Sequence, residues 1–387
     1  MKKWFMPLIV FLIFSDFLFS EELQLIKEVR NGALCQLDQT RKVLFLKGTP
    51  EEMGQAHGEL LKDEIGEMYQ RILVVAAGFA IKEKTSLSKR IQEVEKRTKS
   101  YVPQRFQVEM SQMAKSAQID IKKIRELNYF PEMFHCSGIA VRGEATKDGQ
   151  VRHVRVLDYM RDLGLQENAV LIVYQPSEYF SWLSVSYAGF IGTVTAMNEK
   201  GLAIGEMGGN GEGKWDGLPM SFLMRRIMEE CQTVDEAILL MKSVPLTCDY
   251  YYILSDKTGN MAGVKAIAQT EEPVVVFQAG QEVSELPGAL KDVVYISGKG
   301  ERVETLFARL KDQYGTIDSE SLIEIIKRPV SMKSNLHNAI FEPQTLNLWF
   351  AEAGKSTPAC NEKYLKTNLN DLLLFFESLK KDNLLTK

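Results

Sequence analysis

The sequence predicts an α+β protein in which two antiparallel sheets are covered by helices on their outer faces. Three observations support this fold class. Residues 51–113 show helical periodicity, residues 137–197 form a series of short strand-like runs, and helices and strands then alternate in blocks to the end of the chain. No clear linker or internal repeat interrupts this pattern, so the 387 residues predict one compact unit.

The first part of the chain is predicted to be a helical segment wrapped onto this unit. Apolar residues recur at three- and four-residue spacing over 51–73, which is the period of an amphipathic helix. A second helix is expected over 86–100, before Pro103, and a third repeat runs over 106–113. Pro131 then ends the helical pattern, just before the character of the sequence changes.

After residue 135 the sequence consists mainly of short β-branched or aromatic runs, and turn signals such as Lys-Asp-Gly at 147–149 separate them. The expected strands are 137–146, 150–159, 168–175, 182–187, 192–197, 250–255, 261–266, 274–278, 338–341 and 347–351. The expected helices of this part are 219–232, 234–242, 301–312 and 370–380. Together these elements predict a core over residues 136–387.

The first 20 residues have the composition of a secretory signal peptide. Lys2 and Lys3 precede an apolar run over 4–14, and Ser20 is a small residue at the expected exit. The run is shorter than the roughly 20 apolar residues that a membrane-spanning helix needs. We therefore expect export to the periplasm or the extracellular space. An uncleaved membrane anchor is the alternative, because Asp16 departs from the signal-peptide pattern.

The composition excludes several classes of function. The formal net charge is −4 and no basic cluster with interleaved aromatic residues occurs, so we expect no nucleic-acid partner. The four histidines are scattered and no cysteines have zinc-ligand spacing, so we expect no metal and no cofactor. An odd number of cysteines in an exported protein indicates one reserved thiol, which we take to be Cys136. The pairing of the others stays open; they are Cys35, Cys231, Cys248 and Cys360.

Cys136 begins the first strand of a predicted hairpin whose second strand carries Arg155 and Asp158. A thiol with a pKa of about 8.5 needs a base or a positive field to become a nucleophile at neutral pH. Arg155 can supply the field. If the chain is cut before Cys136, the new α-amine, with a pKa of roughly 7.7–8.0, can accept the thiol proton while Asp158 holds the resulting ammonium group. A three-residue spacing puts Arg155 and Asp158 on opposite faces of a regular strand, so a bend is required for both to serve one site.

The motifs around this cysteine and elsewhere in the chain resemble a known family. Residues 48–58 read Gly-Thr-Pro-Glu-Glu-Met-Gly-Gln-Ala-His-Gly, and residues 197–204 read Met-Asn-Glu-Lys-Gly-Leu-Ala-Ile. Cys136-Ser137 is followed by Asp148-Gly149 and then by Arg155-Val156-Leu157-Asp158. In this order and spacing the chain resembles the acyl-coenzyme A:6-aminopenicillanic acid acyltransferase group of N-terminal nucleophile hydrolases. That group is related to choloylglycine hydrolases, penicillin V acylases and acid ceramidase-type amidases.

The resemblance implies a four-layer αββα sandwich and self-cleavage between His135 and Cys136. The thiol would attack the His135 carbonyl, and water would open the thioester. Behind a signal peptide over 1–20, this gives an α chain over 21–135 and a β chain over 136–387, which form a heterodimer from one precursor. Many relatives have glycine before the nucleophile, where this chain has His135.

The resemblance also assigns site residues. It implies that the thiol is the nucleophile, that Arg155 and Asp158 position and polarise it, and that Asn198 lies in a turn near the site. An ordinary turn role is an equally good interpretation of Asn198, because Asn before Glu-Lys-Gly is common loop chemistry. The bile-salt branch has an oxyanion-donating asparagine a few residues further on, where residues 205–210 here read Gly-Glu-Met-Gly-Gly-Asn. Glu206 is the candidate substrate contact in this stretch.

The sequence therefore predicts a self-processing cysteine hydrolase or acyltransferase that acts on a linear amide of a small or lipid-like N-acyl compound. Hydrolysis and acyl transfer differ only in whether water or an amine receives the acyl group, and both stay open. One alternative is a papain-like hydrolase that uses His153 or His337 as its base. Another is an exported binding protein that has kept the fold and lost catalysis. Association into a homo-oligomer is also left open.

Overall fold

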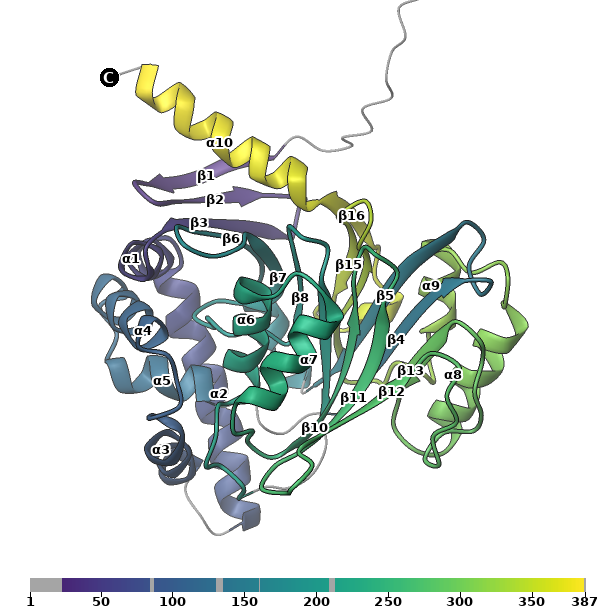
Figure 1. Cartoon of the computed structure of the whole chain (residues 1–387). Helices are drawn as coiled ribbons and strands as arrows, with labels where there is room; N and C mark the ends of the chain where they lie inside the picture. Colours follow the sequence, from purple (N-terminus) through teal and green to yellow (C-terminus); the bar gives the residue numbers. More distant parts are fainter. Residues whose placement is uncertain (1–22, 84–86, 130–134, 160, 209–212, 386–387) are drawn as a thin grey trace, which may run out of the picture.

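The computed structural model describes residues 23–83, 87–129, 135–159, 161–208 and 213–385. These residues form two sheets that face each other, and helices lie on both outer sides (Figure 1). The predicted signal peptide over 1–20 lies outside the described residues. Within the described parts of the chain, no helix combines the length and the apolar character that crossing a membrane requires.

The larger sheet has ten strands. In spatial order they are β1 (Gln24–Val29), β2 (Gly32–Gln36), β3 (Lys42–Gly48), β6 (Ala169–Pro176), β7 (Trp182–Tyr187), β8 (Thr195–Asn198), β9 (Ala203–Gly208), β10 (Asp249–Ser255), β11 (Met261–Ile267) and β12 (Val274–Gln278). Its neighbouring strands pair antiparallel, except that β3 and β6 run parallel. This pair departs from the predicted purely antiparallel sheets, because the chain leaves the sheet after β3 and returns to it only at β6.

The smaller sheet has six strands, which all pair antiparallel. In spatial order they are β13 (Val293–Ile296), β4 (His135–Gly143), β5 (Gly149–Asp158), β14 (Asn335–Glu342), β15 (Asn347–Glu352) and β16 (Leu365–Asn368). The hairpin of β4 and β5 packs against β9 and β10 of the larger sheet. The predicted hairpin after residue 135 therefore lies at the centre of the interface between the sheets.

Helices cover the outer face of each sheet. The described helices are α1 (Pro50–Leu60), α2 (Lys62–Glu83), α3 (Leu87–Thr98), α4 (Gln104–Ala117), α5 (Ile121–Tyr129), α6 (Met220–Glu230), α7 (Val234–Ser243), α8 (Glu301–Asp312), α9 (Ser319–Ile325) and α10 (Leu369–Leu385). Helices α1–α7 lie on the side of the larger sheet, and α8 and α9 lie on the side of the smaller one (Figure 1). The order helix, sheet, sheet, helix confirms the predicted αββα class.

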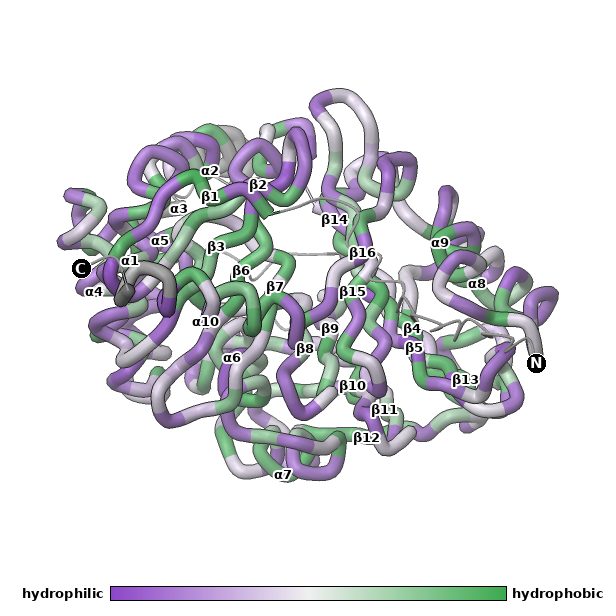
Figure 2. The backbone as a smooth tube through the Cα atoms, turned by 90° about the horizontal axis from the view of Figure 1, so that it is seen from above, coloured by the Kyte–Doolittle hydropathy of each residue, from purple (hydrophilic) through white to green (hydrophobic). Residues whose placement is uncertain are grey.

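The apolar core consists of three clusters of buried residues that follow these layers. The cluster between the two sheets contains Val173 of the larger sheet and Phe350 of the smaller one, and α10 joins it through Phe376, whose ring lies 5.0 Å from that of Phe45. Figure 2 shows that hydrophobic residues are concentrated along β3, β6 and β7, which are inner strands of the larger sheet. The helices around them carry mixed polarity, as expected for elements that bury one side only.

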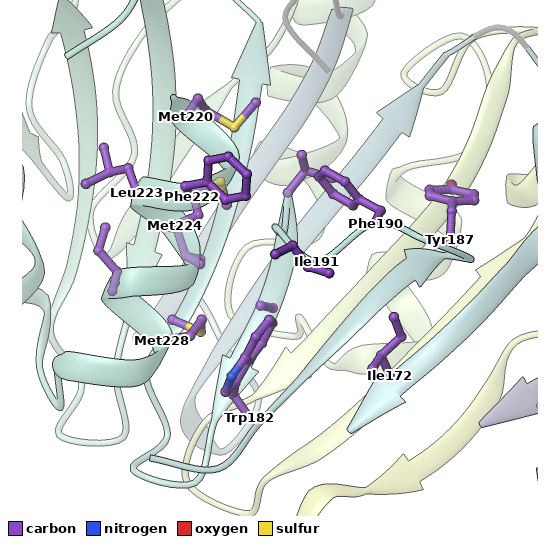
Figure 3. Packing of buried hydrophobic residues seen from close by; sticks show 14 of the residues in the cluster. Ile172, Trp182, Tyr187, Phe190, Ile191, Met220, Phe222, Leu223, Met224 and Met228 are labelled. Carbon is purple, nitrogen blue, oxygen red and sulfur yellow. The ribbon is translucent and has the colours of Figure 1, made fainter. Parts of the chain in front are cut away.

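Helix α6 illustrates how the outer helical layer is attached to the larger sheet. Its side chains Phe222, Met224 and Met228 gather opposite Trp182 and Ile191, and all five are buried in one cluster (Figure 3). Burying a side chain of this size contributes about 1.5–3 kcal/mol relative to leaving it exposed. The apolar side of α6 therefore fixes the helix over β7.

Residues 24–48 differ from the predicted helical N-terminal segment, because they form β1, β2 and β3 of the larger sheet. The hairpin of β1 and β2 is closed by a two-residue turn, since Val29 pairs with Gly32. Runs such as Lys-Val-Leu-Phe-Leu-Lys-Gly over 42–48 are short and bury consecutive residues, which suits a strand and is too short for a stable helix. The helical prediction holds from α1 onward.

Candidate active site

The pairing of β4 with β5 determines where the candidate thiol points. Cys136 pairs with Leu157, and Gly138 pairs with Arg155. Residues directly opposite on antiparallel strands share a face, and so do residues two apart on one strand. The side chains of Cys136 and Arg155 therefore both point toward the larger sheet. Cys136 accordingly belongs to the same buried cluster as Leu157.

Arg155 crosses the space between the sheets over Gly205 of β9. A Cβ atom at Gly205 would lie only 2.8 Å from Cδ of Arg155, so a side chain at this position would displace the arginine. At the far end, Nη2 of Arg155 donates a hydrogen bond to Oε2 of Glu206 over 3.3 Å, and both side chains are fully buried. Nη1 of Arg155 also donates to the backbone carbonyl of Val156. The structure thus brings the predicted residues Arg155 and Glu206 together as a buried ion pair.

The thiol of Cys136 is strongly affected by this environment. Its pKa is raised to about 11, mainly by burial and also by the charges of Glu206 and Asp158, although Arg155 and a hydrogen bond from the Asp158 backbone amide act to lower it. In the intact chain the thiol is therefore protonated at neutral pH. Arg155 stabilises the thiolate but does not offset the cost of burying it, so nucleophilic attack needs a base that takes the thiol proton.

Neither histidine that the papain-like alternative requires is suited to be this base. His153 is fully buried, its Nδ1 lies 3.0 Å from Oγ of Ser255, and burial lowers its pKa to about 3. His337 is also fully buried, and burial followed by the nearby charge of Arg155 lowers its pKa well below the usual value. Both imidazoles are therefore neutral and weakly basic at physiological pH, which speaks against a thiol–imidazolium pair.

Asp158 lies on the opposite face of β5 from Arg155, so the bend that the sequence analysis required does not bring the two side chains together. Its carboxylate forms an ion pair with Arg302 of α8 and accepts a hydrogen bond from the Met332 backbone amide over 2.9 Å. Burial raises the pKa of Asp158, and Arg302 is the largest opposing influence. Arg302 also donates to Oγ of Ser137 over 2.8 Å. Asp158 acts on the thiol through its charge and its backbone amide.

Asn198 lies at the end of β8, in the turn to β9. Its Nδ2 donates to the carbonyls of Met228 over 3.0 Å and Cys231 over 2.8 Å. Its Oδ1 accepts from the amides of Lys200 over 3.1 Å and Leu202 over 3.0 Å. These four bonds use the hydrogen-bonding capacity of the amide, so the geometry favours the turn interpretation, in which Asn198 ties the turn to the end of α6.

His135, the other residue of the predicted self-cleavage site, begins β4 opposite Asp158. Its side chain and residues 130–134 lie outside the described residues. The five cysteines are buried free thiols. Among the residues that the structure describes, no cluster of three His, Cys, Asp or Glu side chains is arranged to hold a metal ion.

An apolar cavity of about 60 Å³ lies next to Leu157, and Cys136 itself is not among its walls. Leu157, the pairing partner of Cys136, is one of its walls. The others are Met68, Ile72, Leu127, Tyr159, Leu165, Tyr187, Ala188, Phe190, Val194 and Leu336. A cavity with almost entirely apolar walls favours an apolar group and disfavours a charged one, because burying an unpaired charge is costly.

In this region sequence reasoning missed Tyr187 and Thr195, and it named His337 only as a possible base of the papain-like alternative. Tyr187, His337 and Thr195 come from β7, β14 and β8 and form a hydrogen-bonded chain between the sheets. The only sequence signal was a histidine within an apolar strand pattern at 335–342, and such a residue is more often a satisfied core histidine than a functional one. Their proximity depends on strand register, which a single sequence does not reveal.

The protonation state of the buried Glu352 carboxyl group can be tested through the pH dependence of stability. It lies opposite His337 on β15, and burial raises its pKa to about 7, with Arg41 lowering the value and Asp38 raising it. The folded state therefore keeps a proton that the unfolded state, with a glutamate pKa of about 4.3, gives up. Stability contributed by this proton is complete below about pH 4 and is lost as the pH rises to about 7.

We predict that Glu352→Gln becomes more stable relative to wild type across this pH window, by on the order of 3 kcal/mol. The measurement is the free energy of unfolding in urea at pH 4.5, 6 and 7.5 for both proteins. An exposed control such as Glu271→Gln should give a curve parallel to wild type. A Glu352→Gln curve that is also parallel to wild type would show that the carboxyl group is ionised in the fold.

Residues 151–277 match the model of the family described as acyl-coenzyme A:6-aminopenicillanic acid acyl-transferase. The matched segment runs from β5 into β12 and includes Arg155, Asp158 and Glu206. This match confirms the resemblance drawn from the sequence motifs.

Similar proteins occur in Dictyostelium discoideum. Protein dcd1B is 28% identical over 364 residues, which cover 84% of this chain and 71% of dcd1B. Protein dcd1A is 26% identical over 376 residues, which cover 86% of this chain and 84% of dcd1A. Among solved structures, a Caenorhabditis elegans N-acylethanolamine-hydrolyzing acid amidase ortholog matches with 16% identity and a TM-score of 0.44, covering 54% of this chain and 93% of that chain.

Proposed function

We propose that this chain, whose residues 151–277 match the acyl-coenzyme A:6-aminopenicillanic acid acyl-transferase family, is a self-processing cysteine amidase or acyltransferase. The observation that carries the proposal is the environment of Cys136. A buried thiol lies near the charge of Arg155, its pairing partner Leu157 lines an apolar cavity, and neither His153 nor His337 is suited to be its base.

The base in this proposal is the α-amine of Cys136 itself. This amine arises in the precursor, where the thiol attacks the carbonyl carbon of His135, the carbon–nitrogen bond breaks, and the thiol proton passes to the departing nitrogen, so that the acyl group moves from nitrogen to sulfur. Water then hydrolyses the thioester and leaves a carboxylate on His135 and a free amine on Cys136. That amine has a pKa of roughly 7.7–8.0 and is covalently next to the thiol, so it can accept the thiol proton at neutral pH.

In the processed enzyme the same thiol attacks the carbonyl carbon of a substrate amide. The amine of the substrate leaves with a proton from the Cys136 ammonium group, and the acyl group stays on sulfur as a thioester. Water or a second amine then takes the acyl group. Arg155 stabilises the thiolate throughout, and Glu206 holds the guanidinium in place over Gly205.

The cavity beside Leu157 supports an apolar acyl group as the part of the substrate that enters the site. Its walls carry almost no polar atoms, so a charged acyl group would lose its hydration without gaining a partner. We therefore include a small or lipid-like N-acyl compound with an apolar acyl chain as the substrate class. Export and assembly as an αβ heterodimer remain parts of the same proposal.

The direct test of this function uses purified full-length protein. Denaturing electrophoresis and intact mass measure self-cleavage, and a panel of N-acyl amino acids, N-acyl ethanolamides, penicillins and bile salts measures amide turnover. We expect two chains that meet at residues 135 and 136, and turnover of at least one apolar member of the panel. A single chain with no turnover of any member would contradict the proposal.

The cavity also predicts an acyl-chain preference that mutation can shift. Ala188 and Val194 both line the cavity and are buried, so Ala188→Leu narrows it and Val194→Ala widens it. We expect the ratio of kcat/KM for long over short acyl chains to fall about 10-fold or more in Ala188→Leu, because a methylene in an apolar pocket is worth roughly 1–3 kcal/mol. Val194→Ala should shift the ratio in the opposite direction. Unchanged chain-length profiles in both variants would exclude this cavity as the acyl site.

The binding-protein alternative is favoured by one observation, the raised pKa of the Cys136 thiol, since a thiol that stays protonated does no chemistry. The two functions differ in the rate at which iodoacetamide alkylates Cys136 at pH 7.5. A processed enzyme should react readily because its α-amine takes the thiol proton. A binding protein that keeps the intact chain should react only as the pH approaches about 11.

A further inference from the structure

A chain of three hydrogen-bonding side chains spans the space between the two sheets. The hydroxyl of Tyr187 lies 2.9 Å from Nδ1 of His337, and Nε2 of the same imidazole lies 2.9 Å from Oγ1 of Thr195. All three side chains are buried, and the Tyr187 and His337 rings stack with centroids 6.0 Å apart. Tyr187 and Thr195 belong to the larger sheet and His337 to the smaller one, so the chain couples the sheets.

This polar chain lies close to the candidate nucleophile. Cys136 pairs with Leu157, and Leu157 pairs with His337 on its other side, so the three residues form one row across the smaller sheet. Side chains in such a row point to the same face, and two strand spacings separate Cys136 from His337 by roughly 10 Å. Tyr187 reaches toward the same place from the opposite sheet and lines the same cavity as Leu157.

The hydrogen-bonded side chains of Tyr187, His337 and Thr195 carry one more donor hydrogen than the two bonds between them use. His337 is neutral, since burial and the charge of Arg155 lower its pKa well below the usual value, so its ring carries one N–H and one acceptor nitrogen. With the two hydroxyls, the chain holds three donor hydrogens, and its two internal bonds use two of them. One hydroxyl hydrogen, on Tyr187 or on Thr195, is left to donate elsewhere.

Of the two hydroxyl groups, only that of Tyr187 belongs to a residue that lines the cavity. Tyr187 lines the apolar cavity next to Leu157, whereas Thr195 is not among its walls. When Thr195 donates to Nε2 and Nδ1–H donates to the Tyr187 oxygen, the phenol hydrogen is free to bind a ligand in the cavity. Burial, followed by the charge of Glu352, raises the pKa of Tyr187 well above its usual value, so the phenol keeps this hydrogen at any practical assay pH.

We propose that Tyr187 is a catalytic residue that donates a hydrogen bond to the oxygen of the acyl group while that group is bonded to Cys136, and that His337 and Thr195 hold the phenol in this orientation. This assignment rests on the proposed amidase or acyltransferase function. As the nucleophile attacks, negative charge develops on the carbonyl oxygen, and a fixed donor stabilises the charged oxygen more than the neutral carbonyl.

The test compares Tyr187→Phe with wild type in two reactions of the full-length, processed protein. Acylation of Cys136 by a p-nitrophenyl ester with an apolar acyl group forms a charged oxygen. Alkylation of the same thiol by iodoacetamide does not. We expect the acylation rate to fall about 10²–10³-fold, the effect of removing one oxyanion donor, while the alkylation rate changes less than twofold. Tyr174→Phe, which also removes a fully buried phenol hydroxyl, is the matched control and should keep both rates.

The outcomes separate this assignment from the proposed function. Wild-type acylation with an equal acylation rate in Tyr187→Phe contradicts the assignment and leaves the proposed function standing. A parallel fall of both rates also contradicts it, because Tyr187 would then act on the thiol or on the fold. A wild-type thiol that is alkylated but never acylated contradicts the proposed function, and the assignment falls with it.

Discussion

Replacement of Cys136 by alanine is expected to remove both self-cleavage and amide turnover. The thiol is the proposed nucleophile in each reaction, and no other described cysteine shares its position near Arg155 and opposite Leu157. Loss of the nucleophile in a comparable hydrolase lowers kcat by on the order of 10⁶-fold, so residual turnover should fall below detection. Intact mass should show one uncut chain in the purified variant.

Two control variants make this result specific. Cys231→Ala removes another buried thiol, which lies at the end of α6, and should keep both self-cleavage and turnover with at most a loss of stability. Cys136→Ser keeps a hydroxyl in place of the thiol and should process slowly, because a hydroxyl is much harder to deprotonate. Turnover in Cys136→Ala at a rate near wild type would eliminate the covalent mechanism.

The second large effect is expected when Arg155 is replaced. The effect on the free energy of unfolding must then be separated from the effect on the reactivity of the Cys136 thiol. Arg155→Met takes the positive charge away from both the thiol and the buried carboxylate of Glu206. Breaking a buried ion pair from one side typically costs about 3–5 kcal/mol, so the single variant should be strongly destabilised. Its Cys136 thiol should also be alkylated more slowly, since the influence that lowers the thiol pKa most is gone.

The double variant Arg155→Met/Glu206→Gln resolves these two contributions. Removing both charges should restore much of the free energy of unfolding, because no unpaired carboxylate is left between the sheets. It should not restore turnover or the alkylation rate at pH 7.5. A double variant that is as reactive as wild type would mean that Arg155 serves the fold alone.

The sequence allowed the fold class to be predicted because its pattern is local. Alternating strand runs after residue 135 and the amphipathic period of α1 and α4 can be identified within windows of about ten residues. Strands β1–β3 were missed because they are short, and their burial comes from a sheet whose other strands lie more than 100 residues further along the chain. The parallel pairing of β3 with β6 is a tertiary choice that no local pattern records.

In the candidate site, too, local motifs could be identified from the sequence, whereas contacts between distant residues could not. Cys136, Arg155 and Glu206 were named as candidates from motifs and the stretches beside them, and the structure places the last two in one ion pair. Asp158 was also named, but strand alternation puts its side chain on the far face with Arg302, a partner 144 residues away. Asn198 was recognised by its motif, and only the hydrogen bonds to α6 indicate that it holds the turn.

The contact between Tyr187 and His337 could not be predicted, because 150 residues separate them and it depends on how the two sheets are stacked. Sequence motifs report residues whose spacing along the chain is fixed by local chemistry. Residues that meet across sheets carry no such spacing, and so the polar chain beside the nucleophile became visible only with the register of β5 and β14.

The most direct measurement follows one peptide bond and one activity in the same sample. Freshly purified precursor is incubated, and at each time point intact mass gives the fraction cut between His135 and Cys136 while a chromogenic apolar amide gives the turnover rate. We predict that turnover rises in proportion to the cut fraction and that the new β chain begins with an unmodified cysteine. Full turnover from protein in which the 135–136 bond stays intact would contradict the role assigned to the amine of Cys136.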